Sequence, residues 1–212
     1  MHVADGILPV EMSIAGYVLA IGVGALASRK LETEEVPRMG LLAAATFVAS
    51  LVNVPVAGVS VHFGLFGLVG LLLGVRVVPV IFAVLILQTF LFQHGGFLSL
   101  GVNVVNMASG GLAAAAIGRY LPGPLGMRAA LAGFIGIFLP VLLLLGEFQI
   151  AGYGRSILLL AGVYAIVGIL EGAFTAMVIA FIGRTKPSLL RHLRPAREND
   201  PVPSPPVKAG VR

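Results

Sequence analysis

The residues best suited to chemistry in this chain are histidines, and one of them is the second residue. In a chain that starts Met1-His2, the terminal amine, the backbone nitrogen of His2 and its imidazole can close on one metal ion in fused chelate rings. A nitrogen-rich, square-planar site of this kind suits Ni(II) or Cu(II). The alternative is that His2 belongs to a frayed terminus. Asp5 and Glu11 stand where a signal peptide would carry Lys or Arg, so we expect no cleaved leader.

Two further histidines stand at the ends of apolar segments. His62 is at the start of one segment and can add a fourth nitrogen to the amine and His2. His94 follows another segment and precedes Gly95 and Gly96. We expect His94 to orient a metal ligand rather than to bind the metal itself.

Other polar side chains lie within the apolar segments, where they are costly and usually mark a site or a pathway. Gln88, Asn103 and Asn106 can equally form interhelical hydrogen bonds that order a bundle. Glu171 lies in the middle of the last segment. A carboxylate there must be protonated, paired or in a wet cavity, so Glu171 is either a structural hydrogen-bonding group or a coupling group.

The composition indicates what class of protein positions these groups. Hydrophobic residues make up 58% of the chain and charged residues 11%, against roughly 25% charged residues in soluble domains. The apolar stretches are continuous rather than alternating, which predicts an all-α membrane protein and not a barrel. There is no cysteine, so a thiolate metal site is excluded. Membrane topology explains the net charge of +5, and nucleic-acid binding is not needed.

The apolar stretches predict seven transmembrane helices. They are Val10–Ser28, Met39–Val52, Val61–Gly74, Val77–Phe92, Gly101–Gly118, Met127–Gly146 and Ile157–Ile182. The second, third and fourth are short for the roughly 20 residues that a span needs, so they are buried in the bundle or one of them is broken. The stretch 53–60 contains Pro and Gly and predicts a structured loop that folds back toward the membrane.

The basic residues predict the orientation. With the amino terminus outside and seven spans, the carboxyl terminus is cytoplasmic and the charges obey the positive-inside rule. The cytoplasmic set is Arg29, Lys30, Arg38, Arg76, Arg119, Arg128 and Arg184, and only Arg155 falls outside. This topology gathers His2, His62 and His94 at the outer end. We divide the chain into a transmembrane metal-binding domain, 1–185, and a disordered, basic, Pro-rich cytoplasmic tail, 186–212.

Small residues recur four positions apart on the predicted helices and let helices approach closely. The stripes are Gly16, Ala20, Gly24 and Ser28; Gly110, Ala114 and Gly118; and Gly168, Gly172, Ala176 and Ala180. We expect packing within this chain, and the alternative is a docking face for a partner membrane subunit.

Motifs that are missing narrow the function. The sequence has no GxxxxGK[ST] and no HExxH, so we expect neither a P-loop ATPase nor a zincin-type protease. A membrane metalloenzyme is disfavoured because no carboxylate stands beside the histidines as a base. A stand-alone secondary transporter or channel for divalent transition-metal cations stays open, with Glu171 as its proton-coupling group.

Taken together, several motifs resemble the CbiM/NikM family, the substrate-binding components of energy-coupling-factor transporters for cobalt and nickel. They run in family order over nearly the whole chain up to the tail. They are Met1-His2-Val3-Ala4-Asp5-Gly6-Ile7-Leu8-Pro9, Ser60-Val61-His62, His94-Gly95-Gly96, Leu100-Gly101-Val102-Asn103, Asn106-Met107 and Glu171-Gly172-Ala173-Phe174-Thr175. One departure is that cobalt-type members carry Ser-His-Pro-Thr-Gly where this chain has Ser60-Val61-His62-Phe63-Gly64.

The resemblance implies a six-helix S-component core plus an extra amino-terminal helix whose free end reaches into the site. It implies metal ligation by the Met1 amine, the backbone nitrogen and side chain of His2, and His62. It also implies a non-enzymatic importer subunit for Ni2+ or Co2+ in the inner (plasma) membrane, without an organic cofactor. The implied partners are a transmembrane coupling subunit, cytoplasmic ATPase subunits and a small accessory membrane subunit. Planar four-nitrogen geometry favours nickel over cobalt.

Overall fold

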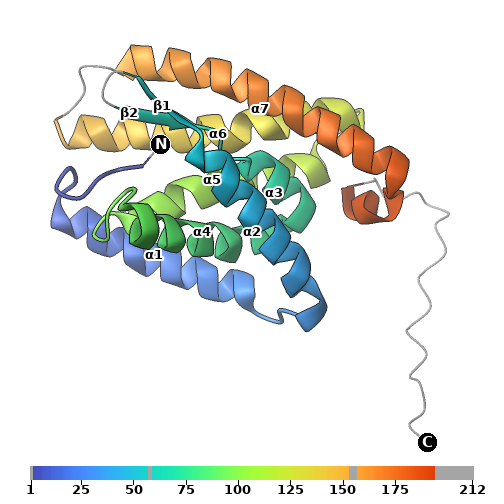
Figure 1. Cartoon of the computed structure of the whole chain (residues 1–212), viewed down its shortest axis with the longest axis horizontal. Coiled ribbons are helices and arrows are strands. Elements are labelled where there is room, and N and C mark those ends of the chain that lie inside the picture. The colour runs from blue at the N-terminus through green and yellow to red at the C-terminus, as the bar shows by residue number, and fades with distance from the viewer. Residues whose placement is uncertain (1, 57–58, 153–156, 194–212) are drawn as a thin grey trace, which may run out of the picture.

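The computed structural model describes residues 2–56, 59–152 and 157–193, which form a bundle of helices with one β-hairpin (Figure 1). The α-helices are α1 (Val10–Ser28), α2 (Val36–Leu51), α3 (Phe66–Leu73), α4 (Val77–Phe92), α5 (Leu100–Tyr120), α6 (Leu125–Ile150) and α7 (Ile157–Thr185). The strands are β1 (Asn53–Val56) and β2 (Val59–His62). Short 3-10 helices are η1 (Thr33–Glu35), η2 (Gly74–Arg76) and η4 (Pro187–Leu193).

Helices long and apolar enough to cross a bilayer dominate the structure. Within the described residues there are five such segments: Val10–Ser28, Phe66–Phe92, Leu100–Tyr120, Leu125–Ile150 and Leu158–Thr185. Their lengths of 19 to 28 residues suit the roughly 20 that a span needs. The chain is therefore a multi-pass membrane protein. Helix α2 has 16 residues and α3 has eight, so seven complete crossings and their orientation stay a prediction.

The all-α expectation is wrong at the stretch between α2 and α3. The sequence predicts a loop over 53–60 and a span over Val61–Gly74, but this stretch folds as an antiparallel hairpin followed by the short helix α3. Asn53 pairs with His62, and Val56 with Val59. The β-branched valines of this stretch favour strands, which explains the difference. The hairpin delivers His62 to the start of α3.

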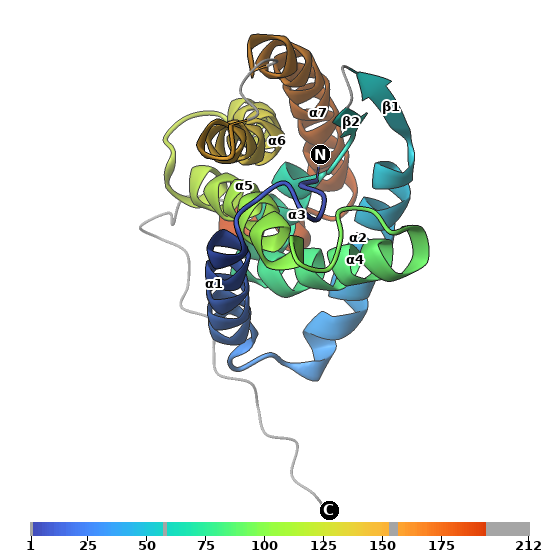
Figure 2. The same ribbon diagram turned by 90° about the vertical axis from the view of Figure 1, so that its left-hand side faces the viewer.

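Helix α5 is the centre of the bundle. It packs against α1, α3, α4 and α6, and Figure 2 shows it between α6 and α1. Glycines bring backbones together here: a Cβ on Gly110 would lie 2.2 Å from the carbonyl oxygen of Gly136 on α6, and a Cβ on Gly16 would lie 2.5 Å from Val102 on α5. At these positions the small-residue stripes serve internal packing, as expected. Gly24 is different, because its nearest neighbour is Phe82 at 4.0 Å.

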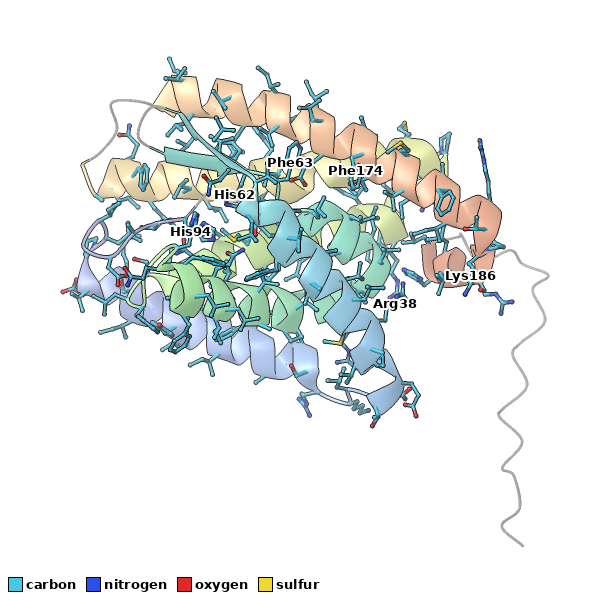
Figure 3. The ribbon with its side chains drawn as sticks, in the orientation of Figure 1. Arg38, His62, Phe63, His94, Phe174 and Lys186 are labelled. Carbon is cyan, nitrogen blue, oxygen red and sulfur yellow. The ribbon has the colours of Figure 1, made fainter. Side chains whose placement is uncertain are left out.

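The basic side chains fasten the end of the bundle that lies away from the histidines; Figure 3 labels Arg38 and Lys186 there. Arg76 donates to the carbonyl oxygens of Ala27, Arg29 and Lys30 and forms an ion pair with Glu35 at 3.0 Å. One guanidinium thus ties the junction of α3 and α4 to the connection between α1 and α2. Arg155 lies outside the described residues.

The expected start of a disordered tail at residue 186 needs correction. Residues Pro187–Leu193 form η4, and Leu190 and Leu193 are buried against the bundle. The buried Arg128 donates to the carbonyl oxygens of Gly118 at 2.6 Å and of Leu193 at 2.8 Å. An apolar pair three residues apart and a hydrogen-bonded arginine explain why this segment packs. Residues 194–212 lie outside the described part of the chain.

This packing predicts that two truncated chains differ in thermal stability. A chain that ends after Lys186 loses η4 and should melt several degrees lower, because burial of each leucine contributes about 1.5–3 kcal/mol and Arg128 loses a carbonyl partner. A chain that ends after Leu193 should melt like the full chain. Circular dichroism in detergent measures both, and equal melting temperatures would show that η4 does not stabilise the bundle.

Candidate metal centre

Three histidines from separate segments meet at one end of the bundle. His2 belongs to the amino-terminal segment, His62 ends β2 and His94 follows α4. One ring nitrogen of each lies within 4.8 Å of those of the other two. The centroid of the His2 ring lies 5.1 Å from that of His62 and 4.5 Å from that of His94. Figure 3 labels His62 and His94 near each other. Metal–nitrogen bonds of about 2.1 Å place opposite ligands roughly 4 Å apart, so small side-chain adjustments suffice to bind one ion.

Hydrogen bonds hold the amino-terminal segment against the start of α5. The side chain of Asn103 accepts from the N–H of Val3 at 2.8 Å and donates to the carbonyl oxygen of Val3 at 3.0 Å. The hydroxyl of Ser99 donates to the carbonyl oxygen of Ala4, and the carboxylate of Asp5 accepts from the N–H of Ser99 at 2.9 Å. Asp5 thereby caps a helix N-terminus. These bonds carry His2 into the bundle.

A chain of hydrogen bonds sets which nitrogen of His2 is free. The hydroxyl of Ser50 donates to the carbonyl oxygen of Phe47 at 2.7 Å, so its oxygen accepts from the amide nitrogen of Gln88. The amide oxygen of Gln88 is then left to accept from Nε2–H of His2 at 3.1 Å. Because a neutral imidazole carries one proton, Nδ1 of His2 keeps its lone pair. That Nδ1 is buried without a hydrogen-bond partner among the described residues.

His62 has the opposite tautomer. Its side chain is 2% exposed, and its Nδ1–H donates to the carbonyl oxygen of Phe63 at 2.9 Å. Its Nε2 therefore has the free lone pair, and it has no partner within the part of the chain that the structure describes. Two bare imidazole nitrogens, from His2 and His62, thus lie in one buried region. In each ring the other nitrogen donates a hydrogen bond, as is usual for histidines that bind metal.

The turn after α4 makes room for the amino-terminal segment. Gly95 and Gly96 have φ of +99° and +102°, which suit glycine. A Cβ on Gly95 would lie 3.4 Å from His2, and one on Gly96 would lie 2.4 Å from the carboxylate of Asp5. The His94-Gly95-Gly96 motif therefore supplies an imidazole and lets the segment with His2 pass closely.

Burial keeps the histidines neutral. Burial, followed by nearby positive charge, lowers the pKa of both His2 and His62 well below 6.5. The same causes lower the pKa of His94. Metal binding requires unprotonated imidazole, so this environment prepares the rings to bind a cation.

Some of the other predicted polar residues contact the amino-terminal segment, and the rest bond to groups elsewhere in the bundle. Gln88 and Asn103 contact the amino-terminal segment directly. Asn106 instead donates to Glu147 of α6 at 2.9 Å, and no hydrogen bond to a histidine is recorded for it among the described residues. Glu171 accepts from backbone N–H groups that follow β2. Met1 lies outside the described residues.

Sequence reasoning missed three supporting residues: Ser50, Ser99 and the capping role of Asp5. Thr46 and Ser50 are polar residues four positions apart on the part of α2 from Met39 to Leu51, which is otherwise apolar, and this spacing is a signal for a polar face. For Ser99 the signal is a serine directly before a helix.

The tautomers are open to measurement. In metal-free protein labelled with 15N-histidine, the NMR shifts should show His2 protonated at Nε2 and His62 at Nδ1, with both rings neutral at pH 6.5. A peptide of residues 1–6 should instead be about half protonated there. Since unfolded chains take up protons near pH 6.5 and these folded rings do not, stability should fall as the pH drops below that value. Equal titration of protein and peptide would contradict this description.

Comparisons with known proteins identify the family to which this chain belongs. A family model described as CbiM, cobalt uptake substrate-specific transmembrane region, matches residues 2–189. A Haemophilus influenzae protein provisionally named for metal transport is 45% identical over 51% of this chain and 53% of its own length, so the match spans about half of that relative. An Archaeoglobus fulgidus protein provisionally named as fused nickel transport protein NikMN is 33% identical over 90% of this chain and 68% of its own length. A crystal structure of a transition metal transporter shares the fold, with a TM-score of 0.80 at 22% identity over 87% of this chain and 93% of that chain. This chain belongs to the CbiM family.

Proposed function

We propose that this chain is the substrate-binding membrane subunit of an energy-coupling-factor importer for Ni2+ or Co2+. The observation that carries the proposal is the pair of bare, buried nitrogens, Nδ1 of His2 and Nε2 of His62. Each is bare because the other nitrogen of its ring donates a hydrogen bond. A cation with affinity for nitrogen satisfies both.

The proposed ligands are the Met1 amine, the backbone nitrogen and Nδ1 of His2, and Nε2 of His62. Nδ1 is the ring nitrogen nearer to the backbone, and so it is the one that can close a chelate ring with the backbone nitrogen of His2. Its availability in the structure supports this set. A planar arrangement of four nitrogens favours Ni2+, whereas the family description supports Co2+.

The rival secondary transporter uses Glu171 as a proton-coupling group. In the structure this carboxylate accepts from the N–H groups of Gly64 and Leu65, which gives it a structural partner and weakens the rival. A metalloenzyme is weakened as well, because the cluster contains histidines and, among the described residues, no carboxylate.

The proposed importer needs a transmembrane coupling subunit, cytoplasmic ATPases and a small accessory membrane subunit in the plasma membrane, with the histidines at the outer end. For the coupling subunit we propose the groove between α1 and α4. It has a volume of about 410 Å³, and Ala20, Gly24 and Phe82 are among its lining residues. Gly24 is the glycine of the α1 stripe that internal packing leaves free.

The amino terminus gives the sharpest test of the ligand set. Adding two residues ahead of Met1 keeps every side chain but moves the amine, and it should abolish tight Ni2+ binding in calorimetry. His2→Ala and His62→Ala should each do the same. A tag at the carboxyl end should be harmless and serves as the control. If the extended protein binds Ni2+ as tightly as the native chain, the amine is not a ligand.

The groove is tested by Gly24→Leu, which fills the space beside Phe82. The variant should bind Ni2+ normally and lose the coupling subunit in pull-downs from a co-expressing cell. Gly22→Leu is the matched control, since a Cβ at Gly22 meets nothing within 4 Å and Gly22 does not line the groove. Equal capture of the coupling subunit by both variants would place its docking face elsewhere.

A further inference from the structure

We infer that Glu171 is a positioning residue for the metal ligand His62: from α7 it holds the peptide group whose carbonyl orients the His62 imidazole. The inference rests on the proposed metal site and adds a role for a residue that does not touch the metal.

Glu171 is fully buried in α7, with 0% exposure. Its Oε1 accepts from the N–H of Gly64 at 2.5 Å. The N–H of Leu65 lies 3.3 Å from Oε1 and 3.1 Å from Oε2. Gly64 and Leu65 form the turn between β2 and α3, so the carboxylate supplies the acceptors that the start of α3 lacks within its own chain segment.

The decisive feature is a single peptide group. The N–H of Gly64 and the carbonyl of Phe63 belong to the same planar unit. Glu171 accepts from its N–H, and Nδ1–H of His62 donates to its carbonyl oxygen at 2.9 Å. A rigid plane held on one edge therefore fixes the acceptor on the other edge. The position of Glu171 sets both the orientation of the His62 ring and the nitrogen that is left for metal.

The turn cannot hold this shape through local bonds alone. Leu65 has φ of +53°, in the left-handed region that non-glycine residues rarely adopt. A Cβ on Gly64 would lie 2.4 Å from the Phe66 ring, so the turn is also tightly packed. Both features require support from outside the segment, and Glu171 gives it.

Helix α7 is itself firmly seated. A Cβ on Gly172 would lie 2.6 Å from the carbonyl oxygen of Ala130 on α6, and one on Gly133 would lie 2.6 Å from that of Glu171. The buried hydroxyl of Tyr164, about two turns earlier on α7, is within hydrogen-bonding reach of the His62 backbone. Two points on one helix thus hold the backbone of His62 and the turn that follows it, so a shift of α7 would move both.

The test compares three variants by Ni2+ titration. Glu171→Leu removes both acceptors and should weaken Ni2+ binding about 10- to 100-fold, as is typical of residues that support metal ligands. Glu171→Gln keeps an amide oxygen at the position of Oε1 for the N–H of Gly64, but its NH2 group replaces the acceptor that lies 3.1 Å from the N–H of Leu65. Because the Gly64 bond is the one that holds the peptide group, this variant should lose clearly less affinity than Glu171→Leu. Thr175→Val, one turn further on the same face, removes a buried hydroxyl without a recorded partner among the described residues and should change nothing.

Two readouts separate positioning from general stability. In 15N-histidine spectra, Glu171→Leu should give a mixture of tautomers at His62 and leave His2 unchanged. In a double-mutant cycle, adding His62→Ala to Glu171→Leu should cost much less affinity than the same change in the native protein, because both act through one ligand. Additive losses or an unchanged His62 tautomer would overturn the inference.

If Glu171→Leu does not fold, Glu171→Asp replaces it. The shorter carboxylate draws back from both N–H groups and should weaken binding several-fold with the helical circular dichroism intact; native affinity would overturn the inference. Failure of the proposed function looks different, because His62→Ala alone would then leave Ni2+ binding unchanged. If His62→Ala loses Ni2+ binding while Glu171→Leu binds Ni2+ with native affinity, only the positioning role of Glu171 is rejected.

Discussion

The metal centre depends on where two imidazole protons are placed. His2 donates through Nε2 to Gln88, and His62 donates through Nδ1 to the carbonyl oxygen of Phe63. Each donation leaves the other ring nitrogen buried and without a hydrogen-bond partner among the described residues. A bare polar atom there is poorly satisfied by protein or lipid, and a nitrogen-seeking cation satisfies it well. Selectivity for a cation thus begins with hydrogen bonds to groups that never touch it.

The bilayer explains why these supports are so fully paired. In the absence of water, a polar group within a span needs an internal partner. Asn103 pairs with the backbone of Val3, Gln88 with Ser50, and Glu171 with the turn after β2. Each pair joins elements that are far apart in sequence. The polar residues that are costly to place within the bilayer are therefore the ones that fix the amino-terminal segment and the hairpin in place.

Much of this was within reach of the sequence. The bounds of α1 and α4 agree with the apolar stretches, and alternation of the spans brings His2, His62 and His94 to one end, where the structure also has them. The hairpin was missed because its valines suit a strand and an apolar span alike. The start of the tail was misplaced because Leu190 and Leu193 form too short a pattern to detect.

The tautomers lay beyond sequence reasoning for a physical reason. The His2 tautomer is set by a bond to Gln88, far along the chain, and the carbonyl of Phe63 that orients His62 belongs to a peptide group bonded to the distant Glu171. No local sequence pattern encodes such pairs. The same remoteness has a consequence for transport under the proposed function. The His2 ring is held from α4 and the His62 ring from α7, so relative movement of these helices changes the distance and angle between the two free nitrogens. A metal site responds steeply to ligand geometry. Under the proposed function, a displacement of these helices is therefore a physical route by which the affinity for the metal can change without any ligand being replaced.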